Sequence, residues 1–361
     1  MTRLHDLFAR QGQSPWIDNL SRPALGSGAL QRMVERGARG VTSNPTIFQK
    51  AITATADYDE QFRSLIATMP VSDAYWAMVV DDIRDACTVL APVHQDSDGC
   101  DGFVSLELAP DLAGDTEASV AAARDLFARV ARPNLLVKIP ATPEGVPAVE
   151  RMVAEGASIN VTLIFGLARY DAIIEAYLSG LEAYAGDLSK VHGVASFFVS
   201  RVDTEIDRRL AAIATPEAVA MRGQAAVCQA KLAWQLFGRR FSGPRWERLA
   251  GRGANVQRPL WASTSTKDPD YPDLLYVDSL IGPDTVNTMP DATLAAFLDH
   301  GTVARTVDQG VTEAEAVIDG LAGCGIDLSE VSSVLEDQGV ASFAKSYDDM
   351  LTCLESKAAG A

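Results

Sequence analysis

Short apolar runs alternate along the chain with longer segments in which apolar residues recur at helical spacing. Eight runs are apolar on successive residues, a pattern typical of parallel strands buried on both faces: 16–20, 40–45, 102–108, 135–141, 159–165, 193–200, 258–264 and 284–290. The clearest amphipathic segments between them cover 72–91, 115–131 and 169–185. The second has one apolar face, formed at intervals of three and four by Val120, Ala123, Leu126, Phe127 and Val130.

Eight predicted strands that alternate with predicted helices indicate an α/β fold, a closed (β/α)8 TIM barrel. The alternative is a doubly wound open sheet, which usually has a glycine-rich phosphate-binding turn after its first strand. The sequence WIDNLSRPALGSG, which includes the first run, lacks the G-x-G-x-x-G spacing of that turn, so we predict the barrel. Since neither a repeat nor a low-complexity linker divides the chain, we expect a single domain over 1–361.

Two segments are predicted to add helices to the barrel. The insertion around 204–257 is too long for one connecting helix, and its pattern predicts a helix over 216–238. The basic stretch that follows, GRRFSGPRWERLAGRG, is interpreted as a loop near the barrel mouth. The tail, about 311–358, has helical spacing and is expected to form a C-terminal extension packed on the barrel.

The charge of the chain limits its partners. Its 361 residues include 31 Lys and Arg against 48 Asp and Glu, a formal net charge of −17. Such a surface repels polyphosphate backbones, which argues against nucleic-acid binding and requires a few local cations for any phosphate ligand.

Location is predicted from the N-terminus, the hydropathy and the cysteines. The N-terminus lacks the apolar core of a signal peptide, and no apolar stretch reaches the roughly 18 residues of a membrane span. The five cysteines are widely spaced and without a CxxC pair, as expected of reduced thiols. We therefore expect a cytoplasmic protein without a membrane partner.

Polar residues near the ends of the predicted strands are the candidates for chemistry, because barrel active sites form where strands run into the following loops. Asn160 and Thr162 lie two residues apart and should face the same side of their strand. The full set contains an amine, two carboxylates, two amides and several hydroxyls: Asp18, Asn44, Glu107, Lys138, Asn160, Thr162, Ser196 and the stretch 263–265.

Lys138 is the most informative candidate. The chain has seven lysines against 24 arginines, yet this lysine lies within the apolar run LLVKIP. Burial of an amine favours its neutral form, which is a nucleophile suited to forming a Schiff base with a carbonyl. A lone strand lysine is more often paired with a core carboxylate or extended to the barrel rim. The presence of Asp18 and Glu107 favours the catalytic interpretation.

The other candidates have structural alternatives. Asp18 can exchange protons during carbon–carbon cleavage, or cap the segment that follows. Glu107 can relay protons through water, or pair with Lys138, and these two roles are compatible. Asn44 precedes a proline, so a turn is the stronger local interpretation.

Neither a metal site nor an acyl-transfer triad is predicted. The four histidines, His5, His94, His192 and His300, lack a ligand spacing such as H-x-x-x-H. No serine stands in a G-x-S-x-G turn. We expect no metal and no cofactor.

Several strand motifs together resemble those of the transaldolase family. The segments WIDNLSR, GVTSNPTIF, LLVKIPAT, INVTLIF and ASFFVSRVD occur in the family's order and approximate spacing, and LWASTSTKDPDYPDLLYVDSLIGPDTVNTMP is similar to its longer bacterial branch. The match covers most of 14–300. The resemblance implies a class I aldolase-type barrel of the non-oxidative pentose phosphate pathway. Such a transferase moves a dihydroxyacetone unit from sedoheptulose 7-phosphate to glyceraldehyde 3-phosphate, which yields erythrose 4-phosphate and fructose 6-phosphate.

The resemblance also implies roles for individual residues. Lys138 matches the Schiff-base lysine, and Asp18 matches the acid/base that acts on the C4 hydroxyl and later on the aldehyde acceptor. Glu107 and Thr162 match the pair that holds a water for the dehydration steps. The substrate-binding positions that it implies on the second, fifth and sixth strands are Asn44, Asn160, Ser196, Phe198 and Arg201.

Phosphate binding is predicted from two positions. Arg201 matches the family's phosphate-binding arginine, and a guanidinium binds phosphate oxygens bidentately. The alternative is a surface arginine that caps Asp203 or Glu205. After the seventh strand the common family pattern is a serine and then an arginine two residues on, whereas this chain has ASTSTK. Ser265 and Lys267 are the predicted clamp, with Ser263 as a substitute, and a lysine supplies charge without the planar fork of arginine.

Two alternative functions remain open at this point. The first is another Schiff-base aldolase, which releases dihydroxyacetone or cleaves a different sugar phosphate and shares Lys138. The second is a catalytically silent sugar-phosphate-binding or assembly protein, which has no need for a desolvated amine. The predicted partners are sugar-phosphate substrates, and the predicted assembly is a monomer or a homodimer.

Overall fold

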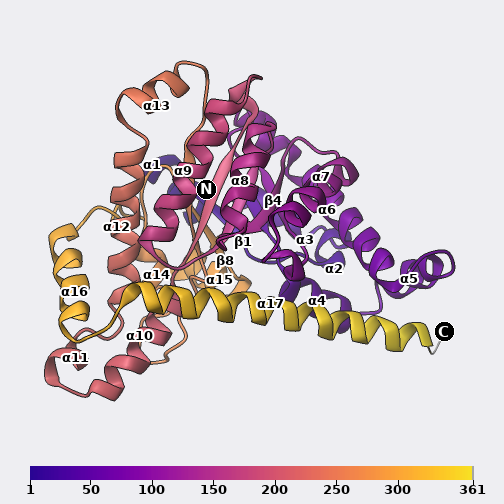
Figure 1. Ribbon diagram of the computed structural model, residues 1–361. Helices are drawn as coiled ribbons and strands as arrows, with labels where there is room; N and C mark the ends of the chain where they lie inside the picture. Colours follow the sequence, from indigo (N-terminus) through magenta and orange to yellow (C-terminus); the bar gives the residue numbers. More distant parts are fainter. Residues whose placement is uncertain (360–361) are drawn as a thin grey trace.

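The computed structural model describes residues 1–359 and contains a closed barrel of parallel strands surrounded by helices (Figure 1). Each strand is hydrogen-bonded to the next in sequence, and the last closes on the first. The strands are β1 (Gln13–Ile17), β2 (Gly40–Thr42), β3 (Phe103–Glu107), β4 (Leu135–Pro140), β5 (Ile159–Ile164), β6 (Gly193–Phe198), β7 (Gln257–Ala262) and β8 (Thr285–Met289). Every predicted run overlaps one strand, so the predicted (β/α)8 TIM barrel is confirmed.

The first strand begins three residues before its predicted run. Gln13 and Ser14 are fully buried although they are polar. The Gln13 amide donates to the Leu280 carbonyl (2.7 Å), and the Ser14 hydroxyl donates to Asp101. These hydrogen bonds offset the cost of burying the Gln13 amide and the Ser14 hydroxyl, so the strand continues where apolar composition alone predicts that it stops.

Helices connect the strands and cover the outside of the barrel. Those up to the end of β6 are α1 (Arg3–Gln11), α2 (Arg22–Gly26), α3 (Ala29–Glu35), α4 (Pro45–Ala54), α5 (Asp59–Ile66), α6 (Val71–Asp96), α7 (Thr116–Val130), α8 (Gly145–Ala154) and α9 (Leu167–Ala183). The later ones are α10 (Ser200–Ile213), α11 (Pro216–Ala220), α12 (Ala225–Arg240), α13 (Gly243–Ala250), α14 (Leu275–Asp278), α15 (Asp291–His300), α16 (Val311–Gly323) and α17 (Leu328–Ala359).

The amphipathic pattern of α7 shows why these segments are helical. The Asp115 side chain accepts a hydrogen bond from the Ala118 amide (3.0 Å) and caps the helix where the sequence predicts it to begin. Val120, Ala123 and Leu126 are buried on the face turned to the barrel. The predictions for 72–91, 115–131 and 169–185 are confirmed by α6, α7 and α9.

The insertion differs from its prediction in two respects. The helix predicted over 216–238 is divided into α11 and α12, with Gly223 in the left-handed conformation (φ +71°) between them. The basic stretch is not a loop at the mouth: it forms the end of α12 and then α13, and residues 251–256 lead from α13 to the first residue of β7. The interpretation as a mouth loop is therefore wrong, because α13 lies at the amino ends of the strands.

Ion pairs with α9 explain the position of α13. Arg245 pairs with Glu175 (2.8 Å) and Glu182 (2.9 Å), both on α9. The Arg245 hydrogen bond is the main reason that the pKa of Glu175 is lowered to about 2. In Figure 1, α13 lies at the top of the molecule and α17 crosses the lower part, above α10 and α11.

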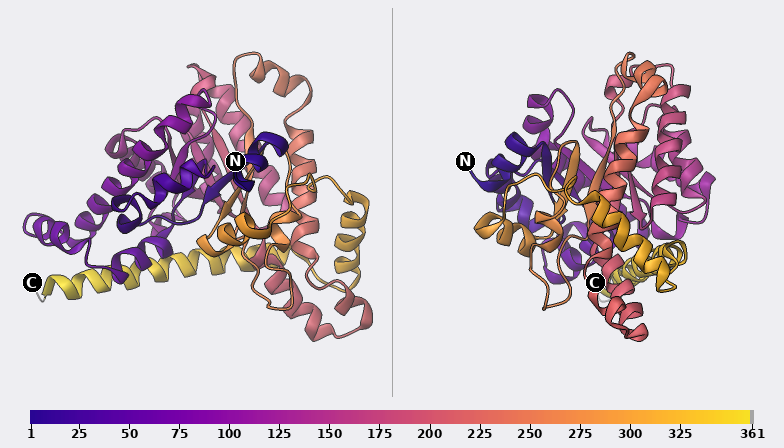
Figure 2. Two further views of the ribbon diagram at one scale, coloured as in Figure 1. Left: turned by 180° about the vertical axis from the view of Figure 1, so that it is seen from behind. Right: turned by 90° about the vertical axis from the view of Figure 1, so that its left-hand side faces the viewer.

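The chain ends in a helix that crosses the open end of the barrel. Both Figure 1 and Figure 2 show α17 as a long yellow helix along one side of the molecule. It packs against α4, α6 and α10, and α16 packs against α12. Ion pairs hold it at several points: Glu336 with Arg169 of α9 (3.1 Å) and Lys357 with Asp59 of α5 (2.6 Å). The predicted C-terminal helical extension is confirmed.

A buried carboxylate joins several elements at the amino end of the barrel, and its removal should destabilise the fold. Asp101 accepts hydrogen bonds from the Trp16 indole (3.0 Å) and from Arg39 (2.8 Å), and Arg258 lies 3.5 Å away. We expect Asp101→Asn to lower the free energy of unfolding by about 2 kcal/mol, because two half-buried arginines lose their buried counter-charge. A thermal unfolding midpoint lower by about 3 °C would show this.

The control for that prediction is a surface ion pair. Glu155 pairs with Arg124, and both side chains are largely exposed. Glu155→Gln should change the midpoint by about 1 °C or less, since exposed pairs contribute little. Equal midpoints for the two variants would contradict the importance of the buried pair.

Candidate functional site

The candidate site is a cavity of about 410 Å³ at the carboxyl ends of the strands. Side chains from seven of the eight strands or the residues just after them reach it, as expected for an active site in this fold. All of the predicted site residues line it except Glu107 and Asn160, which lie beside and beneath it. Its polar and charged lining residues include Asp18, Thr42, Asn44, Lys50, Lys138, Thr162, Ser196, Arg201, Ser263, Ser265, Lys267, Thr288 and Ser342.

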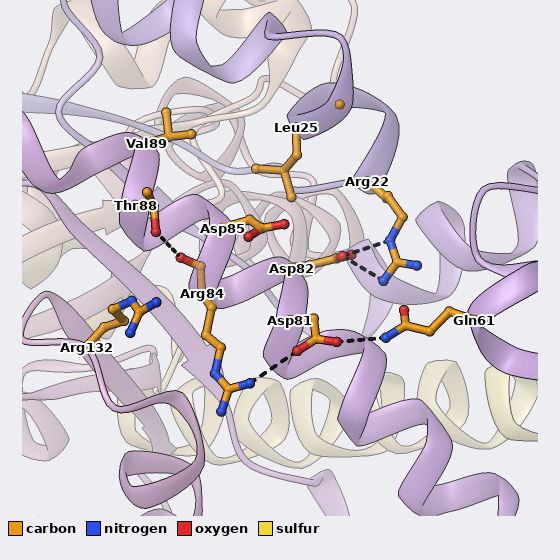
Figure 3. A pocket seen from close by; sticks show the side chains of 11 residues that line it. Arg22, Leu25, Gln61, Asp81, Asp82, Arg84, Asp85, Thr88, Val89 and Arg132 are labelled. Atoms are coloured by element: carbon orange, nitrogen blue, oxygen red, sulfur yellow. Dashed lines mark hydrogen bonds and ion pairs between the residues drawn. The ribbon is translucent and has the colours of Figure 1, made fainter. Parts of the chain in front are cut away.

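A second and larger cavity, about 690 Å³, lies outside the barrel between α2, α5 and α6 (Figure 3). Charged side chains there are paired with each other: Arg22 with Asp82 (2.9 Å) and Arg84 with Asp81 (3.2 Å). Its lining contains no lysine. Because most of its charges are neutralised locally, we assign the chemistry to the cavity at the strand ends.

Lys138 projects from β4 into the barrel and is almost completely buried. Its Nζ lies 2.9 Å from Glu107 Oε2 and donates a hydrogen bond to the Ser43 carbonyl (3.0 Å). Glu107 and Lys138 are direct partners in the β3–β4 register, which explains why their side chains meet. The ion pair foreseen as the structural alternative is present, and the amine nevertheless faces the cavity.

The two carboxyl groups beside the amine are both shifted toward their protonated forms. Burial raises the pKa of Glu107, and the nearby charge of Lys138 opposes this shift. Burial also raises the pKa of Asp18, opposed by the Thr42 hydroxyl, which donates to Asp18 Oδ1 (2.7 Å), and by Lys138. Carboxyl groups with raised pKa values are suited to proton transfer near neutral pH.

The alternative roles of Asp18 and Asn44 have different outcomes. Asp18 caps no helix, since Ser21 is the N-cap of α2. Asn44 is the N-cap of α4 and accepts a hydrogen bond from the Ile47 amide (3.0 Å), so the local turn predicted for it is present. Asn44 also lines the cavity, and both roles belong to one side chain.

Asn160 and Thr162 both point into the barrel, as their spacing predicts, but at different depths. Asn160 is fully buried: its amide donates to the Ser105 hydroxyl (3.0 Å) and its oxygen accepts from Ser196 (2.7 Å). Thr162 lines the cavity, and its buried hydroxyl has no hydrogen-bond partner within residues 1–359. Such a hydroxyl is available to a water or a substrate.

Cations gather at the mouth of the cavity. Arg201 is in the first turn of α10, and its guanidinium lies over the Phe198 ring, 5.5 Å from the centroid. Lys267 donates a hydrogen bond to Ser265 in the loop after β7. Desolvation and the neighbouring Arg201 charge lower the pKa of Lys267, so the two cations share one region. That region is complementary to a phosphate group.

The alternative for Arg201, pairing with a carboxylate of its own helix, is not observed. Asp203 accepts a hydrogen bond from the Ala226 amide (2.7 Å), and Glu205 pairs with Arg208 and Arg209. Over the part of the chain that the structure describes, Arg201 forms no ion pair. Ser263, the predicted substitute in the clamp formed by Ser265 and Lys267, also lines the cavity. Its hydroxyl shares a hydrogen bond with Ser200 (2.9 Å).

Sequence reasoning missed several residues of the site. Thr42 and Thr288 bond to each other (2.6 Å), and Thr42 also bonds to Asp18. The signal for Thr42 was present, because it stands two residues before Asn44 in the run GVTSNP. Phe343 comes from α17, and nothing in the tail of the chain indicates that it reaches the barrel mouth.

Three further observations concern possible metal ligands, the cysteines and possible membrane spans. No group of three or more His, Cys, Asp or Glu with metal-ligand geometry occurs within residues 1–359. All five cysteines are free thiols: Cys87, Cys100, Cys228, Cys324 and Cys353. None of the helices over these residues combines the length and the apolar character of a membrane span.

An amine buried at the carboxyl end of a barrel strand and paired with a carboxyl group of raised pKa is typical of the class of Schiff-base aldolases and their relatives. Comparison with known proteins narrows this class. Residues 15–354 match the family described as Transaldolase/Fructose-6-phosphate aldolase, and the chain belongs to that family. The resemblance noted in the strand motifs is therefore confirmed.

Individual relatives match over nearly their whole length. The chain is 52% identical over 354 residues to a protein named Transaldolase from Parafrankia sp. (strain EAN1pec), with 96% of each chain covered. It is 51% identical over 346 residues to the Transaldolase of Thermobifida fusca (strain YX), with 94% of each covered. It is 49% identical over 348 residues to that of Thiobacillus denitrificans (strain ATCC 25259 / T1), with 95% of this chain and 97% of the relative covered.

Proposed function

We propose that this protein is a transaldolase whose Lys138 carries the reaction. The enzyme is a transferase of the non-oxidative pentose phosphate pathway. It moves a dihydroxyacetone unit from sedoheptulose 7-phosphate to glyceraldehyde 3-phosphate, and the products are erythrose 4-phosphate and fructose 6-phosphate. One observation supports the mechanism above all: the buried Lys138 amine lies 2.9 Å from the Glu107 carboxylate inside the polar cavity.

The first steps join donor and enzyme. Transfer of the Lys138 proton to Glu107 leaves a neutral amine, which attacks the C2 carbonyl of the donor and forms a carbinolamine. Glu107 then returns a proton to the carbinolamine hydroxyl, which leaves as water as the imine forms. The raised pKa of Glu107 supports this role, because the group can hold a proton between the two steps. We assign the water that shuttles these protons to Glu107 and Thr162.

Cleavage and transfer follow on the imine. Asp18 removes the C4 hydroxyl proton, the C3–C4 bond breaks, and its electron pair moves into the imine as an enamine while erythrose 4-phosphate leaves. The enamine carbon attacks the aldehyde of glyceraldehyde 3-phosphate, and Asp18 gives its proton to the new alkoxide. Hydrolysis of the new imine releases fructose 6-phosphate and restores the Lys138 amine.

The remaining residues are assigned to substrate binding. We assign Arg201, Lys267 and Ser265 to the phosphate group, because they form the cationic mouth of the cavity. Asn44 and Ser196 are assigned to the sugar hydroxyls and Phe198 to a wall of the cavity. Asn160 was predicted to bind the substrate directly. Its side-chain oxygen accepts a hydrogen bond from the Ser196 hydroxyl, which supports a role in orienting Ser196 toward the substrate.

The phosphate assignment gives a prediction for Arg201. Arg201→Gln removes the half-buried cation from the mouth, and the KM for fructose 6-phosphate should rise by about 10- to 100-fold through loss of charge-assisted hydrogen bonds. Steady-state kinetics over a range of donor concentrations measures this. As a control, Arg208→Gln removes a largely exposed arginine from the same helix and should leave KM unchanged within about twofold. Equal KM values for the wild type and Arg201→Gln would contradict the assignment.

An acceptor test separates transaldolase from an aldolase that releases free dihydroxyacetone. With fructose 6-phosphate as donor, glyceraldehyde 3-phosphate should form continuously only when erythrose 4-phosphate is present as acceptor. The physical reason is that the dihydroxyacetone unit stays on Lys138 as an imine or enamine until an aldehyde accepts it. Continuous release at the same rate without an acceptor would favour the aldolase.

We also propose a cytoplasmic location and an assembly of one or two chains. The five free cysteine thiols support a reducing compartment. A monomer or a homodimer is compatible with the site because all of the residues assigned above come from one chain.

A further inference from the structure

The C-terminal helix brings an aromatic ring against the phosphate-binding arginine. Phe343 of α17 is only 4% exposed and lines the cavity at its mouth. The guanidinium of Arg201 lies over the Phe343 ring, 6.0 Å from its centroid, and over the Phe198 ring at 5.5 Å. Two aromatic residues from distant parts of the sequence therefore contact one cation.

The position of Phe343 is fixed by contacts along α17. The hydroxyl of Ser346, one turn further on, shares a hydrogen bond with Thr46 of α4 (2.8 Å). Toward the start of the helix, Glu336 pairs with Arg169 (3.1 Å). Contacts on both sides of Phe343 hold this part of the helix on the barrel, so the ring faces Arg201 in a defined place.

The way in which Arg201 is held differs from that of a typical buried arginine. It is half-buried, and burial lowers the pKa of its guanidinium. A carboxylate partner would stabilise the cation but would occupy the N–H groups that a phosphate needs. Within residues 1–359 no carboxylate pairs with it. Aromatic faces attract the cation through their quadrupoles and leave its in-plane N–H donors unoccupied.

We propose that Phe343 is a positioning residue for Arg201. Together with Phe198 it holds the guanidinium at the cavity mouth with its donors free for the substrate phosphate. The C-terminal helix thereby contributes to the preference for phosphorylated substrates. This inference rests on the proposed function for the identity of the substrate, although its central contact is with phosphate alone.

The test compares substrate affinity with turnover. Phe343→Leu keeps an apolar side chain but removes the ring, and the KM for fructose 6-phosphate should rise about tenfold while kcat changes much less. Phe343→Tyr retains the ring face and should restore most of the affinity. Leu335→Ala is the control: it truncates a buried residue of the same helix outside the cavity and should lower the unfolding midpoint without raising KM.

A double-mutant cycle separates positioning of Arg201 from general loosening of the helix. If Phe343 acts through Arg201, adding Phe343→Leu to Arg201→Gln should change KM by less than about twofold. Independent, multiplying effects of the two substitutions would overturn the proposal.

Titration calorimetry with inorganic phosphate gives a measurement that needs no turnover. The Kd of the Phe343→Leu variant should exceed that of the wild type by the same factor as KM. A weaker Kd in an enzyme without transfer activity would support the role of Phe343 and contradict only the proposed function. Equal phosphate affinities for wild type and Phe343→Leu would overturn the role of Phe343.

Discussion

Lys138→Arg should abolish transfer activity while the barrel stays folded. Arginine keeps the positive charge beside Glu107, but its guanidinium cannot condense with a carbonyl to an imine. Without the covalent intermediate the reaction loses its electron sink, and we expect kcat to fall by roughly 10⁴-fold or more. The measurement is formation of glyceraldehyde 3-phosphate from fructose 6-phosphate and erythrose 4-phosphate, with the unfolding midpoint recorded on the same sample.

A second lysine provides the matched control. Lys190 is largely exposed and lies at the amino end of β6, far from the cavity mouth. Lys190→Arg should retain wild-type kcat and KM. Turnover by folded Lys138→Arg within about tenfold of the wild type would show that another residue supplies the nucleophile.

Asp18→Asn should stop the reaction one stage later. The variant keeps the shape of the side chain and an oxygen that accepts from Thr42, but it cannot take the C4 proton. We expect kcat to fall by about 10²- to 10⁴-fold, the usual contribution of a general base. The imine on Lys138 should still form, so borohydride with fructose 6-phosphate should attach the intact six-carbon unit rather than the three-carbon unit.

The pH dependence of the wild type gives a further check on Asp18. Its ionised form is needed for cleavage, and its pKa is raised by burial, so kcat should fall on acidification at a pH above the usual carboxyl range. The charge of Asp291 contributes to the raised pKa. Asp291→Asn should therefore keep activity at neutral pH and move the acid limb to lower pH. If the acid limb of the kcat profile moved to higher pH in Asp291→Asn, this result would contradict the electrostatic account.

Burial on both faces explains why the strands could be predicted from the sequence. In β4 and β6 nearly every residue is apolar, and helices outside and side chains inside bury them completely. The start of β1 was not predicted, because the buried Gln13 and Ser14 are polar and are stabilised by hydrogen bonds to distant residues. Such partners are defined only by the folded chain, so local composition carries no sign of them.

The site was predictable as far as it depends on strand ends. Lys138 and Glu107 belong to neighbouring strands at the same level, and the rule that barrel sites form at the carboxyl ends places them together. The depth of Asn160 was not predictable, because it depends on the stagger between strands. Phe343 was missed for another reason: α17 crosses the mouth, and helical spacing does not specify what a helix packs against.

Borohydride reduction with peptide mapping tests the central claim most directly. With fructose 6-phosphate and no acceptor, the wild type should gain one reduced dihydroxyacetone adduct, located on the peptide that contains Lys138. The same treatment of Lys138→Arg should yield no adduct. An adduct on any of the other lysines, or unmodified Lys138 in an enzyme that turns over, would contradict the mechanism.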